Sequence, residues 1–264
     1  MQTRWQNAFK LVAMKRKDIP MTFEEYEVFA YPFGWKCEYW DGQARLRPRG
    51  MGVTTRLDLT TCDLTPPVTK YPLVPVDPTY TNQMIAGYFE VFADSVEFCD
   101  WPIEEIQKSA ERCMERYFNG KRGDPLPASV IALAPNTQKL IGLALFVLRA
   151  EQRPRLDLLY VRSPFQRQGV ATAMVTWGVN HLIESGFHEL FSAYHICNPQ
   201  SKQWHHAFGL EDVHDFYYLR IRLSWLNHEI ERKEKVGEPA GLEDLLQEQA
   251  QCQAQLEDDP LWSR

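Results

Sequence analysis

The chain has 264 residues, of which 44% are hydrophobic, so it is long enough to bury a sizeable core. Its formal net charge is −6, and no basic surface of the kind that binds nucleic acid is expected. There is no apolar run of about 18 residues and no apolar signal core at the N-terminus, so we expect a cytoplasmic protein without a membrane partner. The six cysteines are scattered without ligand spacing, which predicts reduced thiols and no metal site.

Residues 1–75 are predicted to form a β-rich N-terminal extension. An Asp-Gly pair at Asp41-Gly42 lies between two strand-like stretches, and this pair favours a hairpin turn in which both central residues have positive φ. VTTRLDL (53–59) alternates as a half-buried strand does, and the proline-rich segment 65–78 is expected to be a connector. The aromatic residues Trp35, Tyr39 and Trp40 are expected to pack internally; a cover over the cleft and a homodimer surface are the alternatives.

Residues 76–223 have the patterns of a mixed α/β (α+β) domain. Residues 78–119 are helical in pattern, and they precede three strands, a helix, a strand, a helix and a strand. The predicted strands and helices follow one another along the chain: strands 129–133, 139–148 and 155–161, helix 169–186, strand 188–196, a helix from Asn198-Pro199, and a last long strand at 214–223. Residues 224–264 are predicted to be an acidic helical tail.

One loop in this domain has the chemistry of an anion site. QRQGVA (166–171) lies between an apolar strand and a long helix, where backbone N–H groups and the helix dipole favour a phosphate. Gly169 allows a ligand to approach the main chain, and Gln166, Arg167 and Gln168 offer further donors. An ordinary strand-to-helix loop is the alternative, because neither GxGxxG nor GxxxxGK is present.

The same residues resemble a signature of the GNAT superfamily of acyl-CoA-dependent N-acyltransferases. Gln166, Gly169 and Ala171 stand at the three defining positions of its Q/R-x-x-G-x-G/A motif, and Val161 precedes the glycine as in that family. The segment NPQSKQWHHAFGL (198–210) is similar to the family's N-x-x-A/S…G-F segment. The resemblance covers about residues 76–223.

The resemblance implies a largely antiparallel mixed sheet in which two parallel strands, here 156–161 and 189–195, splay apart around coenzyme A. It implies that acetyl-CoA is the co-substrate and that no metal takes part. The backbone of the strand would pair with the pantetheine arm and hold the thioester carbonyl, the loop amides would hold the pyrophosphate, and Asn198 would contact the arm from the other side. The implied cofactor-binding residues are Leu159, Tyr160, Val161, Gln166, Arg167, Gln168, Gly169, Val170, Ala171, Thr172, Asn198 and Ser201.

The catalytic groups are less well defined, because the chain departs from the family. The usual proton donor is a tyrosine seven residues after the asparagine, and His205 stands there instead. A cationic His205 near the pyrophosphate, a merely solvated His205, and Tyr194 or Tyr160 as donors all stay open. Asp157 is the candidate base, since simple alternation places it on the face of Leu159 and Val161; an ion pair with Arg149 or Arg155 is the alternative.

Two functions follow from this sequence. The first is an N-acetyltransferase that moves an acetyl group from acetyl-CoA to an amine, either a small molecule or a peptide, by direct attack. The second is a catalytically weak module on the same fold that senses acyl-CoA or serves a partner. No local pattern names the acceptor.

Overall fold

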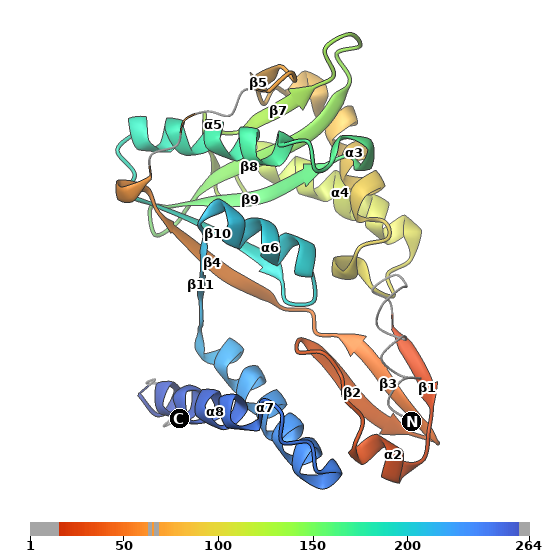
Figure 1. Cartoon of the computed structure of the whole chain (residues 1–264). Coiled ribbons are helices and arrows are strands. Elements are labelled where there is room, and N and C mark those ends of the chain that lie inside the picture. The colour runs from red at the N-terminus through yellow and green to blue at the C-terminus, as the bar shows by residue number, and fades with distance from the viewer. Residues whose placement is uncertain (1–15, 63–64, 66–68, 259–264) are drawn as a thin grey trace. The chain divides into compact units, whose positions relative to one another are not determined.

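The computed structural model describes residues 16–62, 65 and 69–258 of the chain (Figure 1). These residues fall into two compact units. One lies within Met1–Val53, His195–Pro199 and Val213–Arg264, and the other within Thr54–Tyr194 and Gln200–Asp212. The boundaries that we expected at residues 75 and 223 are not the boundaries of these units.

The second unit is built on an eight-stranded sheet. Its order is β11-β4-β10-β9-β8-β7-β5, with β6 paired to β8 outside this path. The strands are β4 (Gly52–Asp58), β5 (Leu73–Pro75), β6 (Asp124–Pro125), β7 (Val130–Leu133), β8 (Leu140–Arg149), β9 (Arg153–Val161), β10 (Glu189–His195) and β11 (Glu211–Val213). The pairs β5/β7, β6/β8, β7/β8 and β8/β9 are antiparallel, and β9/β10 is parallel. The expected fold class, a largely antiparallel mixed sheet with one parallel pair, is confirmed.

Helices cover both faces of this sheet (Figure 1). They are α3 (Thr81–Phe92), α4 (Ile103–Phe118), α5 (Val170–Glu184) and α6 (Pro199–Phe208), with short 3-10 turns η1 (Leu59–Thr61), η2 (Pro78–Tyr80), η3 (Val96–Phe98) and η4 (Ser163–Phe165). Residues of α3 and α4 share a core cluster with Leu143 and Leu145 of β8. Residues of α5 and α6 pack with Ala144 and Phe146, the alternate residues of the same strand. The sheet therefore has an α3/α4 face and an α5/α6 face.

The first unit combines a small sheet with two helices. Its elements are β1 (Lys17–Pro20), α2 (Phe23–Glu27), β2 (Trp35–Trp40), β3 (Gln43–Pro48), α7 (Phe216–Val236) and α8 (Leu242–Glu257), and the sheet order is β1-β3-β2. The predicted hairpin is confirmed: β2 and β3 are antiparallel, and φ is 49° at Asp41 and 71° at Gly42. The N-terminal β-hairpin and the C-terminal helices that we expected are both present.

The predicted strand at 214–223 is wrong. Asp215 caps a helix there, since its Oδ1 accepts a hydrogen bond from the Tyr218 N–H at 2.8 Å. Helix α7 then buries Tyr218, Leu219, Leu226 and Ile230 at helical spacing, so its run of aromatic and β-branched residues does not mark a strand. The strand next to β10 in the sheet is instead β4, which we had assigned to the N-terminal extension.

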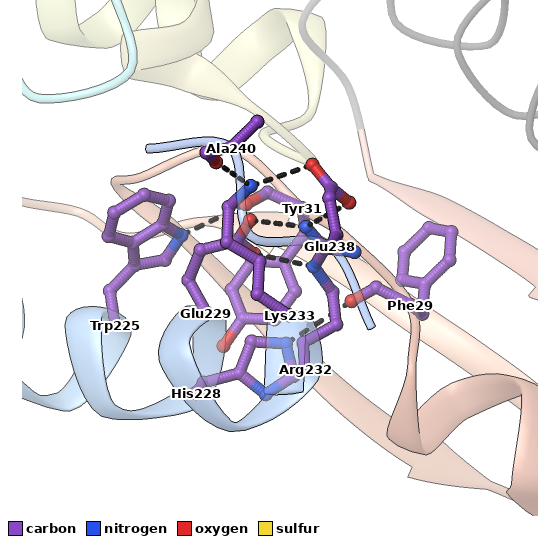
Figure 2. A network of polar contacts seen from close by, with 9 residues as sticks. All are labelled: Phe29, Tyr31, Trp225, His228, Glu229, Arg232, Lys233, Glu238 and Ala240. Carbon is purple, nitrogen blue, oxygen red and sulfur yellow. Dashed lines mark hydrogen bonds and ion pairs between the residues drawn. The ribbon is translucent and has the colours of Figure 1, made fainter. Parts of the chain in front are cut away.

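A network of polar side chains on α7 holds the connector between α2 and β2 (Figure 2). Trp225 Nε1 donates to the Tyr31 carbonyl at 2.9 Å, and His228 Nε2 donates to that of Phe29 at 3.2 Å. Beside them the buried Arg232 makes two hydrogen bonds, of 2.8 and 2.6 Å, to the carboxylate of Glu229. The part of the acidic tail in α7 thus belongs to a folded unit, because Glu229 is paired there with the buried Arg232.

The first prediction concerns this buried ion pair. Replacing Arg232 with alanine leaves the Glu229 carboxylate buried without its partner, so we expect the free energy of unfolding to fall by about 3 kcal/mol. As a control, Arg45→Ala removes the exposed pair with Asp18 in the same unit, and we expect it to cost less than about 1 kcal/mol. Urea unfolding monitored by tryptophan fluorescence measures both; equal losses would contradict this account of the network.

Candidate active site

The parallel strands β9 and β10 part soon after they meet. Within the described chain, their register pairs Phe191 with Arg155. One residue further along each strand, the Ser192 hydroxyl lies 3.4 Å from the Leu156 carbonyl, so a side chain stands where a main-chain bond would continue the ladder. Beyond this point the edge of β9 is free to pair with an added chain.

The backbone of β9 offers this open edge at alternate residues. The Arg162 N–H donates to Ile141 of β8, and Gly142 stands opposite Val161 in the antiparallel register. Hydrogen bonding to one neighbour alternates along an antiparallel strand, so Leu159 and Val161 direct their main-chain groups away from β8. The Val161 carbonyl already accepts a bond of 2.9 Å from Gln166 Nε2. The main chain of Tyr160, by the same alternation, is turned toward β8.

The loop that follows β9 presents a row of free N–H groups. Arg167 and Gly169 have positive φ, 58° and 76°, and Gly169 precedes α5 without any side-chain cap. In the described part of the chain, the N–H groups of 167–172 donate to no acceptor, whereas that of Ala173 bonds Gly169. A Cβ added at Gly169 would meet nothing within 4 Å. Convergent amides at a helix N-terminus with open space before them form an anion site.

The glutamine side chains of the loop make hydrogen bonds within the protein. Gln166 bonds the Val161 carbonyl, and Gln168 Nε2 donates to the Pro164 carbonyl at 2.9 Å. Gln168 Oε1 also accepts from the Tyr71 hydroxyl at 2.5 Å. These amides hold the loop in shape, and their contact with a phosphate stays a prediction. Arg167, in contrast, is exposed beside the free N–H groups.

Asp157 does not lie where alternation predicted. Leu158 stands opposite Leu145 and Leu156 opposite Phe146, so Asp157 is the extra residue of a β-bulge. The bulge turns Asp157 away from the face of Leu159 and Val161. Its side chain is only 3% exposed and is bonded by both Arg122 and Arg149. The ion-pair alternative is therefore the one present, with Arg122 as a second partner that the sequence did not indicate.

His205 is buried against β10. It is 4% exposed, and its Nδ1 lies 2.8 Å from the Ser201 carbonyl, so Nδ1 carries the proton. Nε2 then accepts from the Ser192 hydroxyl at 3.0 Å. Desolvation by burial lowers the pKa of His205, which favours the neutral ring over the cation, and the side chain is not solvated as the alternative had it.

Tyr194 lies beside this histidine. Their ring centroids are 5.4 Å apart, and the Tyr194 hydroxyl donates to Asp212 Oδ2 at 2.9 Å. The other tyrosine that we considered, Tyr160, donates to the Met84 carbonyl at 2.8 Å, and burial raises its pKa. The structure thus brings His205 and Tyr194 together and places Asp157 elsewhere. Asn198 directly precedes α6, and its contact with a cofactor stays a prediction.

Sequence reasoning missed two residues of this region. Ser192 shares a face of β10 with Tyr194, two residues away, and that alternation was the available signal. Tyr71, in the proline-rich connector, gave no signal at all. Among the described residues, no group of three or more His, Cys, Asp or Glu side chains is arranged to hold a metal ion. In the same part of the chain, no helix combines the length and the apolar character needed to span a membrane.

Comparison with known proteins adds a family match. Residues 95–210 match the model of the acetyltransferase (GNAT) family. A GCN5-related N-acetyltransferase from Sphaerobacter thermophilus is 15% identical, with a TM-score of 0.46 over 61% of this chain, which spans 48% of that protein. An aminoglycoside N-acetyltransferase solved with coenzyme A is 19% identical, with a TM-score of 0.41. The match covers 58% of this chain and 95% of that enzyme's chain. A comparison with curated proteins finds no match.

The second prediction follows from the neutral His205. Because its pKa is lowered from 6.5 by folding, the unfolded chain binds a proton more readily, and stability falls as the pH drops below about 6.5. Between pH values of about 7.5 and 5.5, we expect His205→Gln to remove roughly 1 kcal/mol of this loss. Urea unfolding at both pH values measures the difference, with the exposed His188→Gln as control. An unchanged pH dependence in His205→Gln would contradict the neutral ring.

Proposed function

Because residues 95–210 belong to the GNAT acetyltransferase family, we propose that this chain is an N-acetyltransferase that transfers an acetyl group from acetyl-CoA to an amine. The observation that carries the proposal is the row of free N–H groups at 167–172, which meets the open edge of β9. The first suits the pyrophosphate of coenzyme A, and the second suits its amide-containing arm.

Each part of the site then has a task. The amides of Gln168, Gly169, Val170, Ala171 and Thr172 hold the pyrophosphate, with Arg167 as a nearby cation. Leu159 and Val161 orient the arm through their main chain, as an added strand would be oriented. Acetyl-CoA supplies the acetyl group as a thioester, which the amine nitrogen attacks while the carbon–sulfur bond breaks.

Proton transfer is assigned to β10 and α6. A protonated amine must first release one proton to free its electron pair; the attacking amine then loses a second proton, and the departing thiolate gains one. In the neutral ring, Nε2 of His205 is unprotonated and accepts a hydrogen bond from the Ser192 hydroxyl. His205 and Ser192 together can therefore take up a proton and return it. Tyr194 beside them is the second candidate donor. Asp157 is not assigned a role as base, because two arginines occupy its oxygens.

The acceptor is proposed to be a cationic amine. Residues 71–107, which form α3, η3 and the start of α4, contain seven carboxylates and no lysine or arginine: Asp77, Glu90, Asp94, Glu97, Asp100, Glu104 and Glu105. This segment covers the sheet face opposite α5, whose N-terminus holds the phosphates. Glu90 and Glu105 are paired with Arg162 and Lys108, and the remaining excess of carboxylates in this segment favours amines, which are protonated near neutral pH.

A second candidate function is an acyl-CoA-binding module without turnover. It is favoured by one observation, that a buried neutral histidine replaces the family's tyrosine. Release of free thiol from acetyl-CoA in the presence of a panel of small amines and lysine peptides distinguishes the two. We expect amine-dependent thiol release; saturable coenzyme A binding without any release would favour the module.

The third prediction tests the anion site itself. Both Gly169→Ala and Gly169→Glu force a side chain into a left-handed φ of 76°, at a shared cost of about 1 kcal/mol in stability. Only the glutamate adds negative charge and bulk where the phosphates bind. We expect Gly169→Glu to weaken acetyl-CoA binding by at least about 3 kcal/mol, and Gly169→Ala to stay within a few-fold of wild type. Calorimetry on the folded variants measures the acetyl-CoA affinity. A Gly169→Glu variant that binds acetyl-CoA as tightly as the wild type would refute the anion site.

A further inference from the structure

A residue outside the family-matched segment is bonded to the phosphate loop. Tyr71 precedes β5 and is buried, and its hydroxyl donates to Gln168 Oε1 at 2.5 Å across 97 residues of sequence. Its ring also meets that of Phe165 edge-on, with centroids 5.9 Å apart. Two separate contacts therefore join this connector to the loop that carries the free N–H groups.

Gln168 connects Tyr71 to the backbone of the loop. While its Oε1 accepts from Tyr71, its Nε2 donates to the Pro164 carbonyl, so both ends of the amide are held. Between Pro164 and Gly169 the chain adopts a left-handed φ of 58° at Arg167, which is unfavourable for a residue other than glycine. Such a conformation persists when surrounding contacts fix it, and the Tyr71–Gln168 bond is one of them.

The neighbouring Lys70 adds a charge to the same place. Its Nζ lies 5.1 Å from the centroid of the Tyr71 ring, which is itself in contact with the loop. The residue is exposed, and its ammonium lies against the tyrosine ring that packs on Phe165 of the loop. Together with Arg167, it raises the positive potential near the free N–H groups.

We propose that Lys70 and Tyr71 form a second, N-terminal part of the coenzyme A phosphate site. Tyr71 is a positioning residue, which acts through Gln168 to hold the loop amides in their converging arrangement. Lys70 attracts the phosphates by its charge. The inference rests on the proposed function, because it names further residues of the same site.

The test measures coenzyme A affinity by calorimetry in a double-mutant cycle. We expect Tyr71→Phe to weaken coenzyme A binding about fivefold to tenfold, as loss of one partly buried hydrogen bond does. Gln168→Ala should weaken it by a similar factor, and Tyr71→Phe added to Gln168→Ala should have almost no further effect, since Tyr71 acts through Gln168. In kinetics, the KM for acetyl-CoA should rise while kcat at saturation is unchanged.

Tyr117→Phe is the matched control, because it removes the hydroxyl of a buried tyrosine on the α3/α4 face of the same unit. It should leave coenzyme A affinity unchanged. For Lys70, Lys70→Met should make the affinity less dependent on salt concentration than in the wild type. If the wild type binds coenzyme A but Tyr71→Phe binds equally well, or if the two losses are additive, the inference is overturned. If the wild type does not bind at all, the proposed function fails instead.

Discussion

The site depends on backbone hydrogen-bonding groups that the fold leaves without partners. Buried or half-buried N–H and C=O groups are costly when unpaired, so a chain that leaves a row of them open commonly serves a ligand. Here such groups occur in two places, on β9 beyond the point where β10 departs and at 167–172 before α5. Between them, the N–H groups of Arg162, Phe165 and Gln166 are bonded within the protein. Ser192 stands at the departure point and Gly169 at the helix start.

The side chains around this edge mainly hold it in shape. Gln166 bonds the end of β9, Gln168 ties Pro164 to Tyr71, and His205 fixes Ser192 on β10. The carboxylate of Asp157 does not share the face of Leu159 and Val161, because the β-bulge turns it toward Arg122 and Arg149. On the proposed function, main-chain groups recognise the cofactor, and the carboxylate-rich segment 71–107 favours a cationic acceptor.

The local parts of this arrangement could be predicted from the sequence. Asp41-Gly42 encodes its own turn, and QRQGVA encodes a loop and a helix start, because each depends on neighbouring residues alone. The bulge at Asp157 and the burial of His205 could not be predicted, since both arise from partners distant in sequence. Residues 214–223 misled the prediction because their aromatic run fits a strand as well as a helix, and the cap at Asp215 decides. The Tyr71–Gln168 hydrogen bond could not be predicted either, because no sequence motif links these two distant residues.

Amide hydrogen exchange at the loop tests the central claim most directly. The N–H groups of Gly169, Val170, Ala171 and Thr172 have no acceptor in the described part of the chain, so they should exchange rapidly in the free protein. If they hold the pyrophosphate, saturating acetyl-CoA should slow their exchange by at least about tenfold, while amides of α4 are unaffected. Exchange at 169–172 that is unchanged when calorimetry shows the cofactor bound would place the phosphates elsewhere and contradict the account.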